Sequence, residues 1–186
     1  MLDEAWREYE EHPSSYGYRD LIELLPEAEH AGCRQRALDF VADKPIGKVM
    51  DVCVATAEPR LLADRILKTG EDELQAVGHT LGEQAATLVA STSPFAAARI
   101  LVAQAQRILR AAKSKYYDSA MEYVYRASQC YAACGAQDEW AKVAAQIRHE
   151  HRRKGFAVDF EKLLAGKWPE KKETFLDAAK RSWLEG

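Results

Sequence analysis

The stretch from Tyr116 to Lys154 constrains the fold more than any other, because its pattern indicates two amphipathic helices separated by one tight stop. Small and aromatic residues recur at three- and four-residue steps on each side of the stop, which places them on one face of each helix. Gly135 can adopt the left-handed conformation that closes the first helix. The two faces comprise Ala120, Tyr123, Val124, Ala127, Cys130, Tyr131 and Cys134, and then Trp140, Val143, Ala144 and Ile147. Small residues among aromatic ones let two helix backbones approach closely, so a stacked helical hairpin is predicted.

The same helical spacing continues along the chain, and no alternating apolar run indicates a strand. Ser93-Pro94 predicts a capped helix start, and the helix that follows is predicted to be the most buried. Residues 74–90 are predicted to form one helix, in which Gly78 and Gly82 mark the close approach of a neighbour. We therefore predict an all-α fold of about eleven helices. The expected architecture is an array of antiparallel hairpins (an α-solenoid, tetratricopeptide-like but without a fixed period) or a compact irregular bundle.

A single domain spanning residues 1–186 is predicted, since this length suits one compact unit. Its parts are an acidic N-terminal half (1–93), central and C-terminal hairpins (94–166) and a terminal capping helix (167–186). The capping helix is expected to turn an apolar face toward the array and cationic residues toward water. That face comprises Phe175, Leu176, Ala179 and Trp183.

Charge is divided unevenly along the chain, although the net charge is only −3. Residues 1–93 hold 9 Lys and Arg against 18 Asp and Glu, whereas residues 94–186 hold 17 against 11. The basic excess is concentrated in residues 94–154. A basic region can attract an anionic partner, but charges also simply solvate the outer faces of helices.

Nine cations of the basic region form the strongest functional candidate. They form two clusters near predicted helix C-terminal ends, with Arg99 about two turns earlier and Lys115 in the connection. A cation at such an end complements the helix dipole by about 0.3–1 kcal/mol. If the helices that carry them are neighbours, the cations instead merge into one anion-binding surface. The candidate residues are Arg99, Arg107, Arg110, Lys113, Lys115, Arg148, Arg152, Arg153 and Lys154.

No pattern in the chain indicates catalysis, a metal or a cofactor. Phosphate-cradling glycine loops, nucleophile elbows and dinucleotide fingerprints are all missing from the sequence. Cys130 and Cys134 share a helical face, but His149 and His151 lie about 200° apart on a helix and cannot both reach one metal. His79 and Glu83, four residues apart, suit either an acid–base pair or an ordinary helix-surface contact. We predict a protein that is not an enzyme and that needs no cofactor.

Nothing in the sequence indicates a membrane partner or secretion. The N-terminus is acidic, without the apolar segment of a secretory signal. The longest uncharged run, residues 84–98, is too short to span a membrane and contains Pro94. With four cysteines and no disulfide framework, the cytoplasm is the predicted location.

Several segments resemble a bacterial all-helical domain. They are Tyr-Tyr-Asp-Ser-Ala-Met-Glu-Tyr from Tyr116, Cys-Gly-Ala-Gln-Asp-Glu-Trp from Cys134, and Ile-Arg-His-Glu-His-Arg-Arg-Lys from Ile147, with Ala5-Trp6, His12-Pro13, Arg36-Ala37-Leu38 and Pro94-Phe-Ala-Ala-Ala-Arg99. Similar helical arrays follow the zinc module in bacterial SWIM-type zinc finger proteins. That module binds zinc through Cys-x-Cys and Cys-x-His, and neither spacing occurs here. The resemblance implies a helical interaction domain without the metal site.

The function predicted from these observations is a non-enzymatic helical scaffold that binds another protein. Stacked hairpins create the groove or concave face that such scaffolds use. The alternative is a nucleic-acid-associated module that uses the basic surface within residues 94–154, which a steep fall of affinity with salt would reveal.

Overall fold

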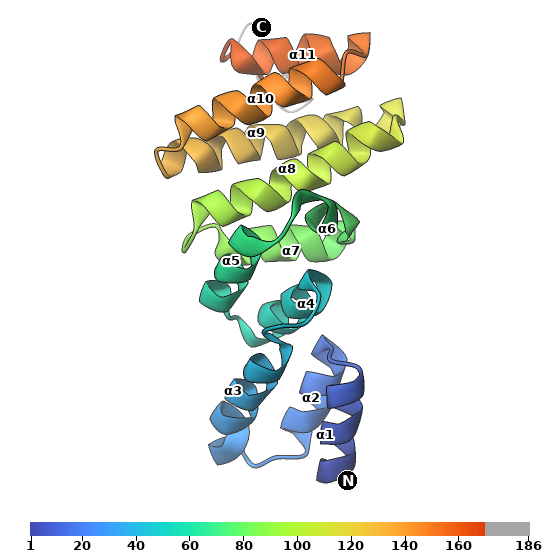
Figure 1. Ribbon diagram of the computed structural model, residues 1–186, viewed down its shortest axis with the longest axis vertical. Coiled ribbons are helices and arrows are strands. Elements are labelled where there is room, and N and C mark those ends of the chain that lie inside the picture. Colours follow the sequence, from blue (N-terminus) through green and yellow to red (C-terminus); the bar gives the residue numbers. More distant parts are fainter. Residues whose placement is uncertain (170–186) are drawn as a thin grey trace, which may run out of the picture.

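A computed structural model of the chain describes residues 1–169, all of whose regular structure is helical. Eleven α-helices are present in this part, which confirms the prediction of an all-α fold with about eleven helices. In Figure 1 the helices follow one another along the long axis, with the N-terminus at one end and α11 at the other. The helices are α1 (Leu2–Glu11), α2 (Ser15–Glu23), α3 (His30–Val41), α4 (Ile46–Thr56), α5 (Pro59–Lys68), α6 (Glu71–Ala76), α7 (His79–Val89), α8 (Pro94–Ala111), α9 (Tyr117–Ala133), α10 (Gln137–Glu150) and α11 (Lys154–Leu164). Two single 3₁₀ turns, η1 (Glu27–Glu29) and η2 (Ser114–Tyr116), lie between α2 and α3 and between α8 and α9.

Local sequence signals explain several helix ends. The Ser93 hydroxyl accepts a hydrogen bond from the Ala96 N–H at 3.4 Å, and Pro94 occupies the first turn of α8. After α9, Gly135 has φ +71°, the left-handed conformation that its sequence position predicts. The predicted capping helix, apart from its first residues, lies outside the described residues.

The prediction of one helix over residues 74–90 is wrong, because the chain turns between α6 and α7. Val77 is extended and buried, and Gly78 precedes the first turn of α7. The Val77 carbonyl does not continue a helix. It accepts hydrogen bonds from two α8 side chains, Gln104 Nε2 at 3.2 Å and Arg107 Nη1 at 2.8 Å. Two long-range polar contacts thus take the place of helix continuation.

Only one of the two glycines in this segment marks a close helix approach. A Cβ atom built on Gly82 would lie 2.8 Å from Gln104 Nε2, so a side chain at this position would push against α8. A Cβ atom on Gly78 would meet nothing within 4 Å. Gly82 therefore has the predicted role, whereas Gly78 belongs to the turn.

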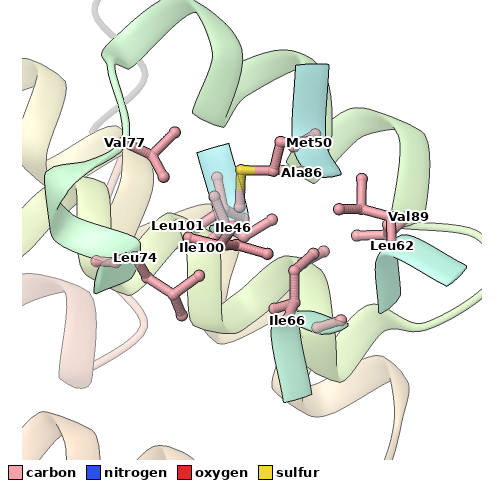
Figure 2. Close-up of a cluster of buried hydrophobic side chains, with 14 of the residues drawn as sticks. Ile46, Met50, Leu62, Ile66, Leu74, Val77, Ala86, Val89, Ile100 and Leu101 are labelled. Carbon is pink, nitrogen blue, oxygen red and sulfur yellow. The ribbon is translucent and has the colours of Figure 1, made fainter. Parts of the chain in front are cut away.

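The hydrophobic core extends through the described helices, and α8 contributes more buried residues to it than any other of them. Eleven of the eighteen α8 residues are buried, as its Ala-, Ile- and Leu-rich sequence predicts. Figure 2 shows part of this core, where Ile100 and Leu101 of α8 lie among Met50, Ile66 and Ala86. Burying one such Leu, Ile or Met side chain stabilises the fold by about 1.5–3 kcal/mol.

The orientation of α8 also determines which helix ends lie on the same side of the molecule. In Figure 1 the C-terminal end of α8 and the start of α9 lie at the right-hand edge, as does the connection from α10 to α11.

Candidate functional site

Arg99 does not belong to a cationic surface, because its guanidinium caps α5. Its Nη1 donates to the carbonyls of Ile66 (2.6 Å) and Leu67 (2.9 Å), and its Nη2 donates to the carbonyl of Thr69 (2.8 Å). The last carbonyls of a helix have no partner within the helix. Arg99 of α8 supplies the missing hydrogen-bond donors, and these bonds connect α8 to the end of α5.

Arg148 and Arg152 are also engaged within the fold. Arg148 forms a two-pronged ion pair with Glu161 of α11, with Nε–Oε1 2.6 Å and Nη2–Oε2 2.7 Å. The Arg148 hydrogen bonds lower the pKa of the Glu161 carboxyl, and the same contact raises the pKa of Arg148. Arg152 donates to the His149 carbonyl at 3.2 Å, which closes the end of α10. These arginines order the α10–α11 region.

The other candidate cations meet at the C-terminal end of α8. The decisive contact is between Arg153 Nη1 and the Ala112 carbonyl at 3.0 Å, which brings the α10–α11 connection against the end of α8. The two predicted clusters therefore do adjoin, although 41 residues separate the two partners of this bond. We name the resulting surface the basic edge, and it comprises Arg107, Arg110, Lys113, Lys115, Arg153 and Lys154.

Members of the basic edge differ in whether their side chains contact other groups of the fold. Arg110 donates to Gln75 Oε1 at 2.6 Å and lies 3.6 Å from the exposed Asp72 carboxylate. The Lys115 ammonium lies 4.7 Å from the centre of the Tyr116 ring. Lys113 is exposed, and its ammonium has no ion-pair or hydrogen-bond partner among residues 1–169. The Lys154 ammonium is likewise exposed and without such a partner among residues 1–169, so Lys113 and Lys154 are the members of the basic edge whose charges remain available.

A cavity of about 490 Å³ opens beside these cations, between α7, α8, η2 and α9. Ile108 and Ala111 give it an apolar wall, and Gln104, only 2% exposed, contributes a buried amide. Two members of the basic edge line it as well. In the part of the chain that the structure describes, the lining comprises His79, Gln104, Arg107, Ile108, Ala111, Lys113, Tyr116 and Ser119. The cavity therefore combines positive charge with an apolar surface.

His79 is held at this cavity by a contact that local sequence did not predict. Its Nδ1 lies 2.6 Å from the hydroxyl of Tyr123 on α9, 44 residues away. Burial, followed by the negative charge of Glu83 and a hydrogen bond to it, raises the pKa of Tyr123 to about 12. Glu83 itself forms an ion pair with Arg126 across α7 and α9. His79 therefore bonds to Tyr123, and Nε2 is the ring nitrogen left for other contacts.

His151 lies close to Arg110 and is largely covered. Its side chain is 12% exposed, and its buried Nε2 has no hydrogen-bond partner in the described part of the chain. Burial is the main cause that lowers the pKa of His151. The positive charge of Arg110 lowers it further, while Glu150, 3.8 Å away, opposes the shift.

The cysteines do not gather with histidines. Cys33 and Cys53 are buried in the N-terminal half, Cys130 is half-buried and Cys134 is exposed, and all four are free thiols. Over residues 1–169, no group of three or more His, Cys, Asp or Glu side chains is arranged to hold a metal ion.

Comparisons with protein-family models, with curated proteins and with solved structures find no match for this chain. Among the described helices, none has the length and apolar character needed to cross a membrane.

Proposed function

We propose that this chain is a non-enzymatic helical scaffold that binds another protein, and that the basic edge is its contact surface. The observation that supports this most is the cavity beside Lys113, where an uncommitted cation adjoins an apolar wall. Protein partners supply both complements of such a surface, an acidic group and an apolar side chain.

The pattern of internal bonds favours a protein over a nucleic acid. Nucleic-acid binding draws its affinity from many cations that each neutralise a phosphate. Here Arg99, Arg107, Arg110, Arg148 and Arg153 already donate hydrogen bonds to groups of the fold. Each of these hydrogen bonds holds the guanidinium against the fold, so these arginines are less free to follow a phosphate backbone, whereas one concave site with a few charges suits a single protein segment.

Two further elements of the proposal come from the sequence alone. The resemblance to helical arrays of bacterial SWIM-type zinc finger proteins stays a prediction, and so does the cytoplasmic location. The exposed free thiol of Cys134 fits a reducing compartment.

Capture of a partner by the full chain tests the proposal. We would compare the unaltered protein with the double variant Lys113→Glu/Lys115→Glu, which reverses two of the six charges of the basic edge. The matched control, Lys48→Glu/Arg60→Glu, makes the same charge change at exposed positions on α4 and α5.

The expected result is a protein captured by the unaltered chain and by the control but lost with the edge variant. Capture that does not depend on the basic edge would contradict the proposal. Edge-dependent capture of nucleic acid in place of protein would also contradict it, and would support the alternative function.

A further inference from the structure

We infer that the cavity at the basic edge receives the carboxylate side chain of an acidic segment of the partner protein, held against Lys113 and Arg107. This inference rests on the proposed function, and it adds the chemistry of the bound group.

The charges that face the cavity select an anion. Lys113 offers three ammonium hydrogens, none engaged within residues 1–169. Arg107 uses Nη1 for the Val77 carbonyl, and a guanidinium has five N–H donors, so others remain. Within the described residues, no carboxylate side chain lines the cavity to neutralise these two cations. A ligand carboxylate would receive charge-assisted hydrogen bonds, which are roughly twice as strong as neutral ones.

Shape and polarity favour a side chain with a hydrocarbon stem. The volume of about 490 Å³ falls within the range of about 300–1,000 Å³ that is usual for ligand sites, so a Glu or Asp side chain enters with room for adjoining backbone. Ile108 and Ala111 can pack against the methylene groups of that side chain. Among residues 1–169 the lining also offers amide, hydroxyl and imidazole groups, which can form hydrogen bonds with a peptide backbone.

The surroundings of the cavity indicate that residues flanking the anchor are acidic as well. Lys115, Arg153 and Lys154 continue the positive surface beyond the cavity and are exposed. Basic residues of a partner would be repelled by this surface, whereas acidic residues would be steered toward the basic edge. The occupant that fits best is therefore an acidic protein segment with one carboxylate inserted.

Fluorescence anisotropy with defined probes tests this inference on the full chain. The main probe is a fluorescein-labelled 12-residue peptide of Glu, Asp, Leu and Gly. Its partner probe has Gln and Asn in place of Glu and Asp, so that only the carboxylates differ. A labelled 12-nucleotide single-stranded DNA tests whether anionic charge alone is sufficient.

Three variants separate insertion into the cavity from diffuse attraction. Lys113→Ala is expected to weaken peptide binding about tenfold, because it removes a charged hydrogen-bond donor. Ala111→Trp fills the cavity without changing charge and is expected to abolish binding, while Lys48→Ala is expected to leave it unchanged. Melting temperatures of all variants show whether each one remains folded.

Binding of the acidic peptide but not of its amide counterpart, lost with Ala111→Trp, would support the inference. Full binding by folded Ala111→Trp or by Lys113→Ala would overturn it, as would tighter binding of the DNA than of the peptide. Self-association blocked by either variant would also overturn it, since the acidic half of a second copy would then be the occupant. If the basic edge captures a protein but no acidic peptide binds, the proposed function stands and only this inference fails.

Discussion

Replacing Arg99 tests whether this residue is a structural cap or a free cation. In Arg99→Met the stem of the side chain is retained, but three carbonyl groups at the end of α5 lose their donor. A hydrogen bond to a charged group contributes about 1.5–3 kcal/mol when measured singly. The three bonds share one half-buried guanidinium, and the freed carbonyls can partly rehydrate. We therefore expect the free energy of unfolding to fall by about 3 kcal/mol in total, not by three full increments.

The measurement is urea unfolding monitored by circular dichroism at 222 nm. The variants can be compared if the free energy of unfolding depends on urea concentration with the same slope in each. Arg99→Lys is the informative second variant, because it keeps the charge but cannot span three carbonyls. It should recover less than half of the loss. Lys113→Met is the matched control, and its effect should stay within about 0.5 kcal/mol because the side chain is exposed. An Arg99→Met protein as stable as the control would show that Arg99 is not a cap.

The remaining predictions concern packing, thiols and pH. Gly82→Ala should destabilise the protein by about 1–2 kcal/mol, since overpacking against α8 outweighs the helix propensity of alanine. In Gly32→Ala on α3 the added Cβ meets no atom within 4 Å, so this control should not be destabilised. Equal shifts of the melting temperature in the two variants would contradict this prediction. Cys134 should react with a thiol reagent within minutes in the native protein, while burial, which raises the pKa of Cys53 to about 12, should protect that thiol until unfolding. Because burial lowers the pKa of His151 in the folded state, the unfolded chain binds more protons as pH falls through about 6.5. Stability should therefore fall between pH 7 and pH 5, and less so in His151→Gln; an unchanged slope in that variant would count against the assignment.

Much of the fold was predictable because it depends on local signals. Helical periodicity predicts the elements, Ser93-Pro94 predicts the start of α8, and Gly135 predicts the end of α9. The sequence of α8 also predicts its burial, since few polar residues interrupt its apolar positions. These features require only neighbours in the chain.

The features that sequence reasoning missed all depend on contacts between distant segments. The break before α7 accompanies the capture of the Val77 carbonyl by two α8 side chains, 27 and 30 residues away. The sequence groups Arg99 with Arg107 and Arg110 as a candidate cation, yet only tertiary packing gives it the end of α5 as partner. Trp140 lies on the inward face of its helix as predicted, with its ring centre 6.2 Å from that of Tyr131, but its side chain is only half-buried. Periodicity predicts which face of a helix points inward, but it does not predict how completely a neighbouring element covers that face.

The candidate site was partly predictable for the same reason. The cationic residues and the condition under which they would merge both follow from the sequence. Which cations meet does not, because that depends on the contact between Arg153 and the Ala112 carbonyl. The cavity and the bond between His79 and Tyr123 likewise arise only when α7, α8 and α9 pack.

Hydrogen–deuterium exchange of the full chain, with and without the acidic 12-residue peptide, tests the central claim most directly, because it locates the binding surface without altering the protein. We expect slower exchange in residues 107–119 and 151–156, which surround the cavity and the basic edge, and unchanged exchange in α1 to α5. Protection that falls instead on α1 to α5, or on the α9–α10 turn at the opposite edge in Figure 1, would contradict the proposed surface.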